Sequence, residues 1–255
     1  INSYPQKGID EMIAAEKAFA AYSVAHGTKE AFLKFIDTAA VMFNGGEPLN
    51  GYQLWLKKEK RPGVLNWRPR YAEIAASGDF GYTCGPWTFQ PKTINDRIVA
   101  TGYFFTVWHK TRSGDWKFIL DVGTDAGPMM MDTTVTKIFK EKGKGSPATL
   151  RDAERKFIRL YKEDTAKAYV QYISDKVVLA REGKELSNNG NEGRSIAAAA
   201  PGKIVFTYKG SGVAPSGDLG YTFGSAELAG KKETWLRIWR HEVTGWKIAV
   251  QLIRL

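Results

Sequence analysis

The stretch that decides the fold is Gly78-Asp79-Phe80-Gly81-Tyr82-Thr83-Cys84-Gly85, because the chain repeats it as Gly217-Asp218-Leu219-Gly220-Tyr221-Thr222-Phe223-Gly224. Six of the eight positions are identical, at an offset of 139 residues. Solenoid repeats are far shorter, at about 20–50 residues. The repeat therefore indicates a duplicated domain. It also supplies an internal comparison: a polar group found in both copies is a candidate for supporting the fold, and one found in a single copy is freer to serve function.

The duplication extends beyond this stretch. Further matches are 15–19 with 153–157, Asp37 with Asp175, and Trp108 with Trp239. The offset falls toward the end of the repeat, as expected when a surface loop is shorter in one copy. We predict a first domain over 8–126, a linker over 127–147, and a second, more degenerate domain over 148–255.

Periodicity and turn residues predict an α+β fold for each copy. In copy one the predicted helices are 9–25, 28–37 and 51–58, and the predicted strands are 41–43, 67–74, 79–89, 98–110 and 116–123. Helices followed by a strand meander are typical of an α+β layer. In the linker, we expect the first part, with Met129, Met130 and Met131, to pack as a helix, and the part at 142–145 to be flexible.

A family resemblance rests on residues spread over most of copy one. They are Phe32, Ile36-Asp37, Val41, 45–48, Gly51, Trp67, Pro69, 71–73, 77–83, Gly85, Trp87, Gly102-Tyr103, Val107-Trp108, 114–117 and Asp121. On them, each copy resembles the nuclear transport factor 2-like (NTF2-like) superfamily, also called SnoaL-like or cystatin-like, in its bacterial branch of unknown function. The resemblance implies two tandem cone-shaped domains, each with about three N-terminal helices on a curved antiparallel or mixed sheet, and a pocket in between.

The superfamily hosts isomerases, cyclases, dehydratases, epoxide hydrolases and non-catalytic binding domains, so its fold alone does not decide activity. Ketosteroid-isomerase-like members use a carboxylate after the first strand as base, with a Tyr and a protonated Asp as oxyanion donors. The resemblance places Met42 or Phe43 at the base position, Ala20 near the Tyr position and Thr101 or Phe104 at the Asp position. The steroid-isomerase reading is therefore disfavoured, and an epoxide-hydrolase Asp-Arg-Asp relay cannot be placed.

Two polar residues of copy one remain candidates. Strand alternation groups Asp121 with Lys117, away from the face of Phe118 that we expect to be the core side. We therefore predict that Asp121 points away from the pocket, in a structural hydrogen bond or a contact between domains. His109, matched by Arg240 in copy two, either rims a pocket or is a hydrogen-bonded histidine at a strand end.

The sequence predicts no cofactor and no metal site. The three histidines are scattered without ligand spacing, and the single Cys84 is expected to be a buried apolar residue. The net charge of +10 lies mostly after residue 126, with 22 basic and 14 acidic residues, against 15 and 13 before it. Because Arg155, Arg159 and Lys162 have the spacing of a solvated helix face, and no nucleic-acid motif accompanies them, nucleic acid is an improbable partner.

Both faces of the central strand at 98–110 carry large apolar groups. Phe104 and Trp108 lie on one face, and Tyr103 and Phe105 on the other. A half-solvated sheet would keep one polar face. We therefore predict that the copies pack sheet against sheet within the chain, as an intrachain pseudo-dimer, with Trp108 and Trp239 at the contact.

The favoured function is a non-catalytic module that binds a small, largely apolar ligand or a peptide. The candidate pocket residues are Phe19, Tyr22, Phe43, Trp67, Tyr82, Tyr103, Phe105 and His109, with Phe157, Tyr161 and Tyr221 in copy two. The alternative is a lyase or isomerase with a single acid-base group in copy one. An ionisable group aimed into a conical cavity would favour that alternative.

The sequence has no apolar run approaching the ~18 residues of a transmembrane helix. The chain begins at Ile1 rather than Met, so we expect an upstream segment to have been removed. We predict a periplasmic or secreted protein, with the cytoplasm as the alternative location.

Overall fold

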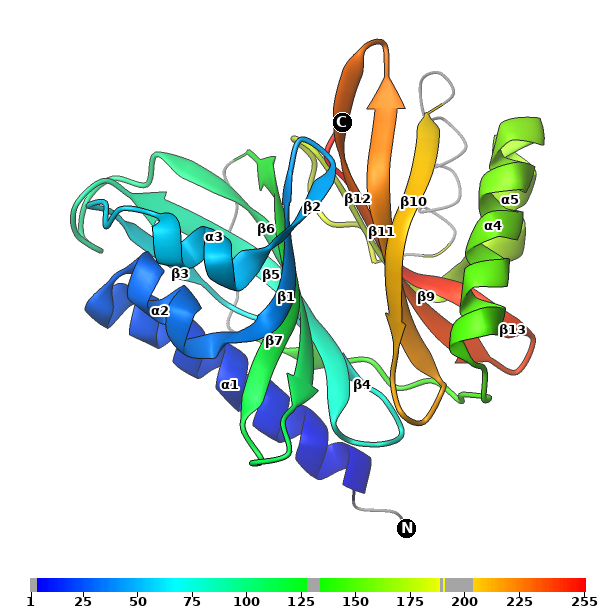
Figure 1. Ribbon diagram of the computed structural model, residues 1–255, viewed down its shortest axis with the longest axis horizontal. Helices are drawn as coiled ribbons and strands as arrows, with labels where there is room; N and C mark the ends of the chain where they lie inside the picture. The colour runs from blue at the N-terminus through cyan, green and yellow to red at the C-terminus, as the bar shows by residue number, and fades with distance from the viewer. Residues whose placement is uncertain (1–3, 128–133, 189, 191–203) are drawn as a thin grey trace. The chain divides into compact units, whose positions relative to one another are not determined.

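The computed structural model places most of the chain (Figure 1). The residues it describes are 4–127, 134–188, 190 and 204–255. They form two compact units: unit 1 spans residues up to 43 and 49–139, and unit 2 spans 44–48 and 140–255. Each unit combines helices with a sheet, which confirms the predicted α+β class. The domain boundaries 8–126 and 148–255, and the sheet-to-sheet packing of the copies, stay predictions.

Unit 1 is a helical layer on a mixed sheet. Its elements are α1 (Tyr4–His26), α2 (Thr28–Phe35), β1 (Ile36–Asn44), β2 (Glu47–Asn50), α3 (Gly51–Lys57), β3 (Val64–Trp67), β4 (Tyr71–Ile74), β5 (Phe80–Gln90), β6 (Ala100–Lys110), β7 (Trp116–Ala126) and β8 (Thr136–Lys137). The strand order is β2-β1-β7-β6-β5-β4-β8, with β3 also paired to β5. Helices α1 and α2 lie on one face of this sheet, and α3 lies beside α2 (Figure 1).

Local sequence explains where the helices of unit 1 begin. Gly27 has a φ of 94°, a backbone conformation that favours glycine, and it separates α1 from α2. The Asn50 side chain accepts a hydrogen bond from the backbone of Gln53 and so caps α3. The resulting chain reversals bring three helices onto one face of the sheet.

Unit 2 repeats this plan. Its elements are α4 (Pro147–Glu163), α5 (Thr165–Tyr172), β9 (Ile173–Arg181), β10 (Val205–Val213), β11 (Leu219–Leu228), β12 (Lys231–Glu242) and β13 (Gly245–Ile253). The strand order is β10-β11-β12-β13-β9. Strand β9 runs parallel to β13, as β1 runs parallel to β7. The position expected for a counterpart of α3 falls mostly outside the described residues.

Strand pairing corrects one match of the repeat. Ile36 pairs with Phe118 in unit 1, and Ile173 pairs with Ile248 in unit 2. The first strands are therefore related by 173 − 36 = 137 residues, not 138. At this offset Asp37 corresponds to Ser174, and the predicted match with Asp175 is wrong by one residue.

A β-bulge in the last hairpin sets which side chains of β7 face the helices. Val107 pairs with Leu120, whereas the next residue, Trp108, pairs with Phe118, so Ile119 has no partner across the hairpin. An extra residue of this kind reverses the alternation of faces. In unit 2, β12 and β13 have the same shift, which leaves Ala249 unpaired.

The bulge overturns the predicted orientation of Asp121. Phe118 belongs to the core cluster that contains the helices of unit 1. Beyond the bulge, Asp121 pairs with Thr106, which shares the face of Trp108, also in that cluster. Asp121 therefore faces the helices, inside the cone. The expectation that it points away was wrong because uninterrupted alternation was assumed across Ile119.

The same geometry corrects the expected role of two tryptophans. Trp108 and Trp239 are fully buried, and each packs in the core between the helices and the sheet of its own unit. The prediction that they form the contact between copies is therefore wrong. The apolar residues on the other face of β6 are Tyr103, Phe105 and Val107.

The second half of the linker is tied to unit 2. The backbone N–H of Gly143 donates to the carbonyl of His241, and that of Gly145 donates to the carbonyl of Gly217, both at 2.7 Å. The prediction of a flexible segment at 142–145 is therefore wrong. In the first half, the described residues contain the short strand β8 beside β4; Met129–Met131 lie outside the described residues.

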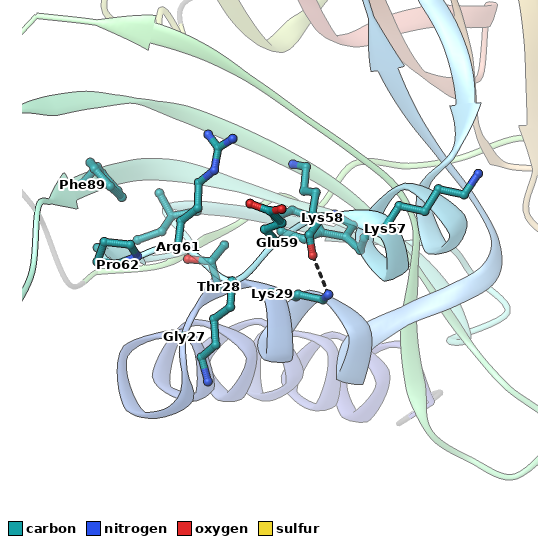
Figure 2. Close-up of a pocket in the computed structure, with 13 residues that line it drawn as sticks. Gly27, Thr28, Lys29, Lys57, Lys58, Glu59, Arg61, Pro62 and Phe89 are labelled. Atoms are coloured by element: carbon teal, nitrogen blue, oxygen red, sulfur yellow. Dashed lines mark hydrogen bonds between the residues drawn. The ribbon is translucent and has the colours of Figure 1, made fainter.

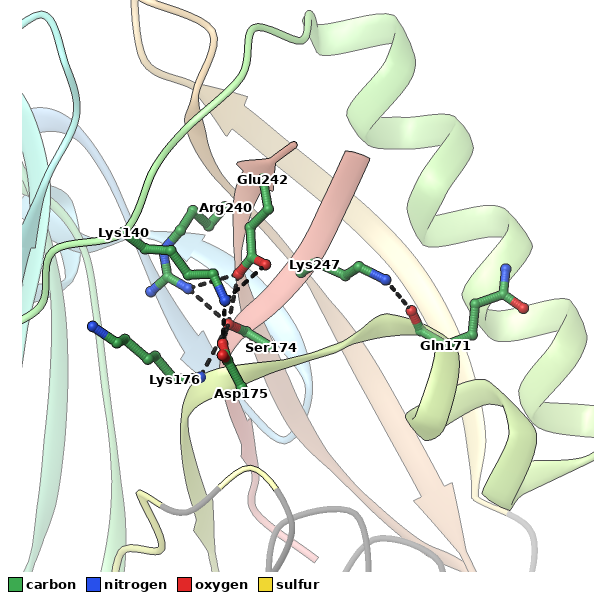
Figure 3. Close-up of polar contacts among 8 residues, drawn as sticks. All are labelled: Lys140, Gln171, Ser174, Asp175, Lys176, Arg240, Glu242 and Lys247. Carbon is green, nitrogen blue, oxygen red and sulfur yellow. Dashed lines mark hydrogen bonds and ion pairs between the residues drawn. The ribbon is translucent and has the colours of Figure 1, made fainter. Parts of the chain in front are cut away.

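A buried polar cluster strengthens this attachment (Figure 3). The fully buried Arg240 donates to the Ser174 hydroxyl at 2.9 Å and to the Glu242 carboxylate at 3.1 Å. Lys140, from the linker, forms ion pairs with Asp175 and with Glu242, the latter at 3.2 Å. The two cations, Lys140 and Arg240, are balanced by the two carboxylates, so we assign the cluster to the fold.

We expect Gly145→Ala to lower the free energy of unfolding. A Cβ atom there would lie 2.6 Å from the Trp246 ring and 2.8 Å from the His241 ring. Overpacking of this kind costs about 1–3 kcal/mol. The control is Gly127→Ala, whose Cβ would meet nothing within 4 Å. Equal urea midpoints for the two variants would contradict close packing of the linker on unit 2.

Candidate functional site

A buried carboxylate lies at the centre of unit 1. Glu16, on α1, is fully buried. It accepts hydrogen bonds from the indole N–H of Trp67 at 2.5 Å, the hydroxyl of Thr83 at 2.5 Å and the indole N–H of Trp108 at 2.9 Å. Burial raises the pKa of Glu16, and these three donors oppose that rise. The carboxyl group thus joins α1 to three strands of the sheet.

Unit 2 contains the same arrangement. Glu154, on α4, accepts from Thr222 at 2.6 Å and from the Trp239 indole at 3.1 Å. Its third donor is Arg237, at 2.5 Å, in place of an indole. Because the carboxylate, the threonine and the tryptophan recur in both units, we assign this cluster to the fold.

The cone of unit 2 is filled by Arg237. This residue is fully buried. Its guanidinium carbon lies 4.3 Å from the ring centroids of Phe157 and Phe206 and 4.4 Å from that of Trp235. Its Nε donates to Gln251 at 2.8 Å, and Gln251 donates to the Tyr169 hydroxyl at 3.0 Å. Successive hydrogen bonds therefore join Glu154 through Arg237 and Gln251 to Tyr169 in the interior of unit 2.

The corresponding positions of unit 1 carry different residues. Strand pairing matches Thr106 with Arg237 and Asp121 with Gln251. The Thr106 hydroxyl donates to Asp121 at 2.8 Å. Asp121 is partly exposed, whereas Gln251 is only 5 % exposed. A carboxylate is therefore present in the interior of unit 1 at the position where unit 2 has an amide.

Burial raises the pKa of Asp121 to about 7, and the nearby Glu16 carboxyl adds to the rise. The hydrogen bond from Thr106 and the positive charge of Lys58 act in the opposite direction. The residue as a whole is half-buried, and its carboxyl group lies deep among protein atoms. Near neutral pH it is present in both protonation states, so it can donate or accept a proton.

A cavity of about 530 Å³ opens at the wide end of unit 1 (Figure 2). It is bounded by the turn between α1 and α2, the end of α3, the loop that follows and parts of β3 and β5. Its lining residues are Gly27, Thr28, Lys29, Trp55, Lys57, Lys58, Glu59, Lys60, Arg61, Pro62, Gly63, Leu65 and Phe89. We call it the basic cavity, because five of its lining residues are cationic and one, Glu59, is acidic.

Lys58 connects the basic cavity to the interior. Its ammonium group lies 3.8 Å from the ring centroid of Trp55, and burial lowers its pKa. Its charge also acts on Asp121. The loop itself is held by Lys29, whose ammonium group donates to the carbonyls of Leu56 and Lys58 (Figure 2). The chain thus places a carboxylate inside the cone and a cationic cavity at its wide end.

The predicted ligand-binding residues divide between the two faces of the sheet. On the helix side, Phe19 and Trp67 pack edge to face, with ring centroids 4.7 Å apart. Tyr22 is half-buried beneath the Lys34 ammonium group, 4.0 Å from its ring centroid. Phe43 is half-buried near the end of β1.

The other predicted residues lie on the opposite face. Tyr82, Tyr103 and Phe105 are buried there, and the Tyr82 hydroxyl donates to Glu73 at 3.1 Å. His109 lies 2.8 Å from the Asp37 carboxylate, as expected for a hydrogen-bonded histidine at a strand end. None of the eight predicted residues lines the basic cavity. As ligand contacts they stay predictions.

Sequence reasoning missed two features for which a signal existed. Glu16 lies within the stretch that matches 153–157, so its recurrence as Glu154 could have revealed a shared buried carboxylate. The signal for the basic cavity is the run 57–61, Lys-Lys-Glu-Lys-Arg, which gathers four of its cationic residues in one segment. At the predicted base position, the Met42 sulfur accepts from the Trp55 indole at 3.0 Å, so the side chain there offers no carboxylate.

Cys84 is fully buried, and burial raises its pKa, which fits the predicted apolar role. Within the described residues, the histidine, cysteine and acidic side chains form no group of three placed to hold a metal ion. None of the helices in the described part of the chain has the length and hydrophobicity needed to cross a bilayer.

No family model and no curated protein matches the chain. Similar solved structures include a ketosteroid isomerase-like protein from Erwinia carotovora atroseptica SCRI1043, at 16% identity over 42% of this chain and 93% of that chain, with a TM-score of 0.36. An NTF-2 like protein of unknown function from Shewanella oneidensis MR-1 shares 14% identity over 42% and 98% of the two chains, with a TM-score of 0.36. A protein of unknown function with a cystatin-like fold from Nostoc punctiforme PCC 73102 shares 9% identity over 44% and 94%, with a TM-score of 0.36. These ketosteroid isomerase-like, NTF-2 like and cystatin-like proteins agree with the resemblance that the sequence predicts.

We expect Asp121→Asn to change how stability depends on pH. The folded-state pKa of about 7 lies above the ordinary aspartate value of 3.8. The folded protein therefore binds this proton more tightly than the unfolded chain, and its stability falls as pH rises from about 4 to 7. Asparagine removes this loss, so the variant should gain roughly 1–3 kcal/mol relative to wild type between pH 4 and pH 8.

Urea unfolding of both proteins at several pH values measures this difference. The control is Asp115→Asn, which removes a carboxyl group from the exposed turn before β7. If the wild-type and Asp121→Asn curves run parallel from pH 4 to pH 8, the carboxyl group does not titrate as proposed.

Proposed function

We propose that unit 1 binds a small apolar molecule carrying a negative charge, with the charge held in the basic cavity. The observation that carries the proposal is the composition of the cavity wall. Lys57, Lys58, Lys60 and Arg61 stand in one short segment, with Glu59 the single carboxylate among them. Field lines from like charges in a concave site reinforce one another and attract an anion.

The cavity also offers apolar surface and a suitable size. Trp55 is stacked on Phe32 with ring centroids 4.1 Å apart, so its position is fixed by the core. Leu65 and Phe89 are half-buried in the same wall. A volume of about 530 Å³ lies within the usual range of about 300–1,000 Å³ for small-molecule sites. These features favour a small ligand over a peptide.

We expect the double variant Lys60→Glu/Arg61→Glu to weaken binding of a small apolar anion at least tenfold. Two favourable charges become unfavourable, and each exchange near a partly solvated anion is worth about 1 kcal/mol. The probe is 8-anilinonaphthalene-1-sulfonate, followed by fluorescence titration and by chemical shifts of the Trp55 indole.

The matched control is Arg155→Glu/Arg159→Glu, which makes the same change of charge on the exposed face of α4. If both double variants weaken binding equally, only the net charge of the protein matters. If neither weakens it, the basic cavity does not hold the anion, and the proposal fails.

A second candidate function is proton transfer by Asp121. It is supported by a carboxyl group inside the cone whose pKa is raised to about 7. A base with a pKa near the working pH combines a useful population of the ionised form with sufficient proton affinity. This is the arrangement that a lyase or isomerase with a single acid-base group in unit 1 requires.

Phenylpyruvate tests this second function, because it combines an apolar ring, a carboxylate and an acidic C–H bond. In D₂O the ionised Asp121 would remove a benzylic proton, and the enolate would take up a deuteron. We expect exchange, followed by proton NMR, to exceed the buffer rate and to rise with pH up to about 7. Wild-type exchange rates in Asp121→Asn would exclude this role.

A further inference from the structure

We infer that the mouth of the basic cavity docks on the surface of an anionic lipid bilayer. The loop between β5 and β6, residues 91–99, inserts exposed apolar side chains among the lipids, and the cations around the mouth bind the headgroups. None of these loop residues lines the cavity, so the inference goes beyond the proposed function and is measurable without a bound ligand. In combination with the proposed function, it makes the bilayer the source of the apolar anion.

The β5–β6 loop begins at the wall of the cavity. Phe89, near the end of β5, lines the cavity, and its carbonyl accepts from the backbone N–H of Val99 at 3.0 Å, which closes the loop. Strand β3 pairs with this part of β5 and so places the preceding loop, residues 58–63, beside Phe89. Figure 2 shows Pro62 and Phe89 along the same side of the cavity. The two loops therefore border one mouth.

Four large apolar side chains at this mouth are exposed to solvent. Ile94, Ile98 and Val99 are 41 %, 45 % and 55 % exposed, and Leu56, in the last turn of α3, is 44 % exposed. Single exposed apolar residues are ordinary on protein surfaces, but three in one short loop are not. The other exposed large apolar residues of the described chain lie one each in five separate segments, at Leu49, Phe139, Val170, Val205 and Val243.

The β5–β6 loop holds its shape through its own hydrogen bonds. The Asp96 carboxylate accepts from the backbone N–H groups of Lys92 and Thr93, at 2.9 and 2.8 Å. The Gln90 side chain donates to the carbonyl of Ile94 at 3.2 Å. The carboxylate of this loop is therefore turned toward its own backbone, and the apolar side chains are presented with little further ordering cost on binding.

Cations surround the exposed apolar side chains. Within residues 56–62 and 91–99 the acidic residues are Glu59 and Asp96 alone. The cationic residues of these segments, all exposed, are Lys57, Lys58, Lys60, Arg61, Lys92 and Arg97. Lysine and arginine strengthen attachment to an anionic bilayer when they lie within a Debye length, about 10 Å, of its surface. The mouth thus combines apolar insertion with electrostatic attraction.

This combination suits a bilayer better than a protein or a nucleic acid. Along 94–98, Ile-Asn-Asp-Arg-Ile, polar residues separate the apolar ones, which therefore do not form the continuous apolar core of a protein interface. Nucleic acid offers phosphates but no apolar phase for the isoleucines. A bilayer offers hydrocarbon beneath its headgroups and phosphates at the level of the cations, whose methylene stems also pack on apolar surroundings.

Co-sedimentation with sucrose-loaded vesicles tests the inference. We expect the protein to bind vesicles of phosphatidylcholine with about 30 % phosphatidylglycerol, and to bind pure phosphatidylcholine at least tenfold more weakly. Salt at about 0.5 M should release most of the protein, because it screens the charge of the headgroups.

Two double variants of the loop separate the apolar contribution from the electrostatic one. Ile94→Ser/Ile98→Ser removes apolar surface at constant charge and should lower the vesicle partition coefficient about tenfold. Lys92→Glu/Arg97→Glu reverses two charges and should lower it by at least as much.

Unit 2 offers matched controls for both variants. Val170→Ser/Val243→Ser makes the apolar change at two exposed valines, and Arg155→Glu/Arg159→Glu makes the charge change on the exposed face of α4. Both controls should keep vesicle binding within about threefold of wild type, because neither touches the mouth.

A fluorescent label reports insertion directly. Cys84 is fully buried, so Ile98→Cys supplies the reactive thiol for a nitrobenzoxadiazole label. Its fluorescence should at least double when anionic vesicles are added, because the dye leaves water for the bilayer. The same label on Val243→Cys should not respond.

Four results would overturn the inference. They are no binding to anionic vesicles, equal binding to neutral ones, equal retention of binding by all four double variants, and an Ile98→Cys label that does not respond. A protein that ignores vesicles but forms a dimer, lost in Ile94→Ser/Ile98→Ser on sedimentation velocity, would make the loop a contact between copies instead.

The same proteins separate the inference from the proposed function. The loop variants should keep wild-type affinity for 8-anilinonaphthalene-1-sulfonate measured without vesicles, since their changes lie outside the cavity. A protein that binds vesicles but not this anion supports the inference and overturns the proposed function. The opposite pattern overturns the inference alone.

Discussion

A carboxyl group removed from water and held by a threonine and a tryptophan is the interaction on which each unit depends. Glu16 and Glu154 lie in the first helix of their units, and each bonds to strands distant in sequence. Leaving such a group without partners costs several kcal/mol. Helix and sheet must therefore meet in one register, which also fixes the position of every other side chain in the cone.

From this common base the two interiors differ. Unit 2 satisfies its carboxylate with a buried arginine and extends the polar chain through Gln251 to Tyr169. Unit 1 satisfies the same group with the Trp67 indole and has a second carboxyl group, Asp121, which accepts from Thr106. One copy thus pairs a buried arginine with its internal carboxylate, and the other has a second ionisable group in its interior.

The sequence predicted the duplication, the α+β class and the course of most strands, because these depend on periodicity and turn residues. It misplaced Asp121 because a bulge leaves no mark in the composition of β7. It missed Glu16 as a buried group, since one glutamate on a helix resembles any solvated one until its partners on distant strands are known. The sequence predicted a flexible linker because glycine-rich segments are often mobile. Gly143 and Gly145 instead allow the backbone to pack closely on His241 and Trp246.

The unpaired residue in the last hairpin separates two sets of inward-facing positions. If Ile119 were paired and the strand alternated regularly through it, Leu120 and Val122 would enter the cone and Asp121 would leave it. The position of the bulge in β7, as well as the identity of its residues, therefore determines which side chains face the interior. Relatives that lack the extra residue need a gap at Ile119, because an alignment without one would match their inward-facing residues to outward-facing residues of this chain.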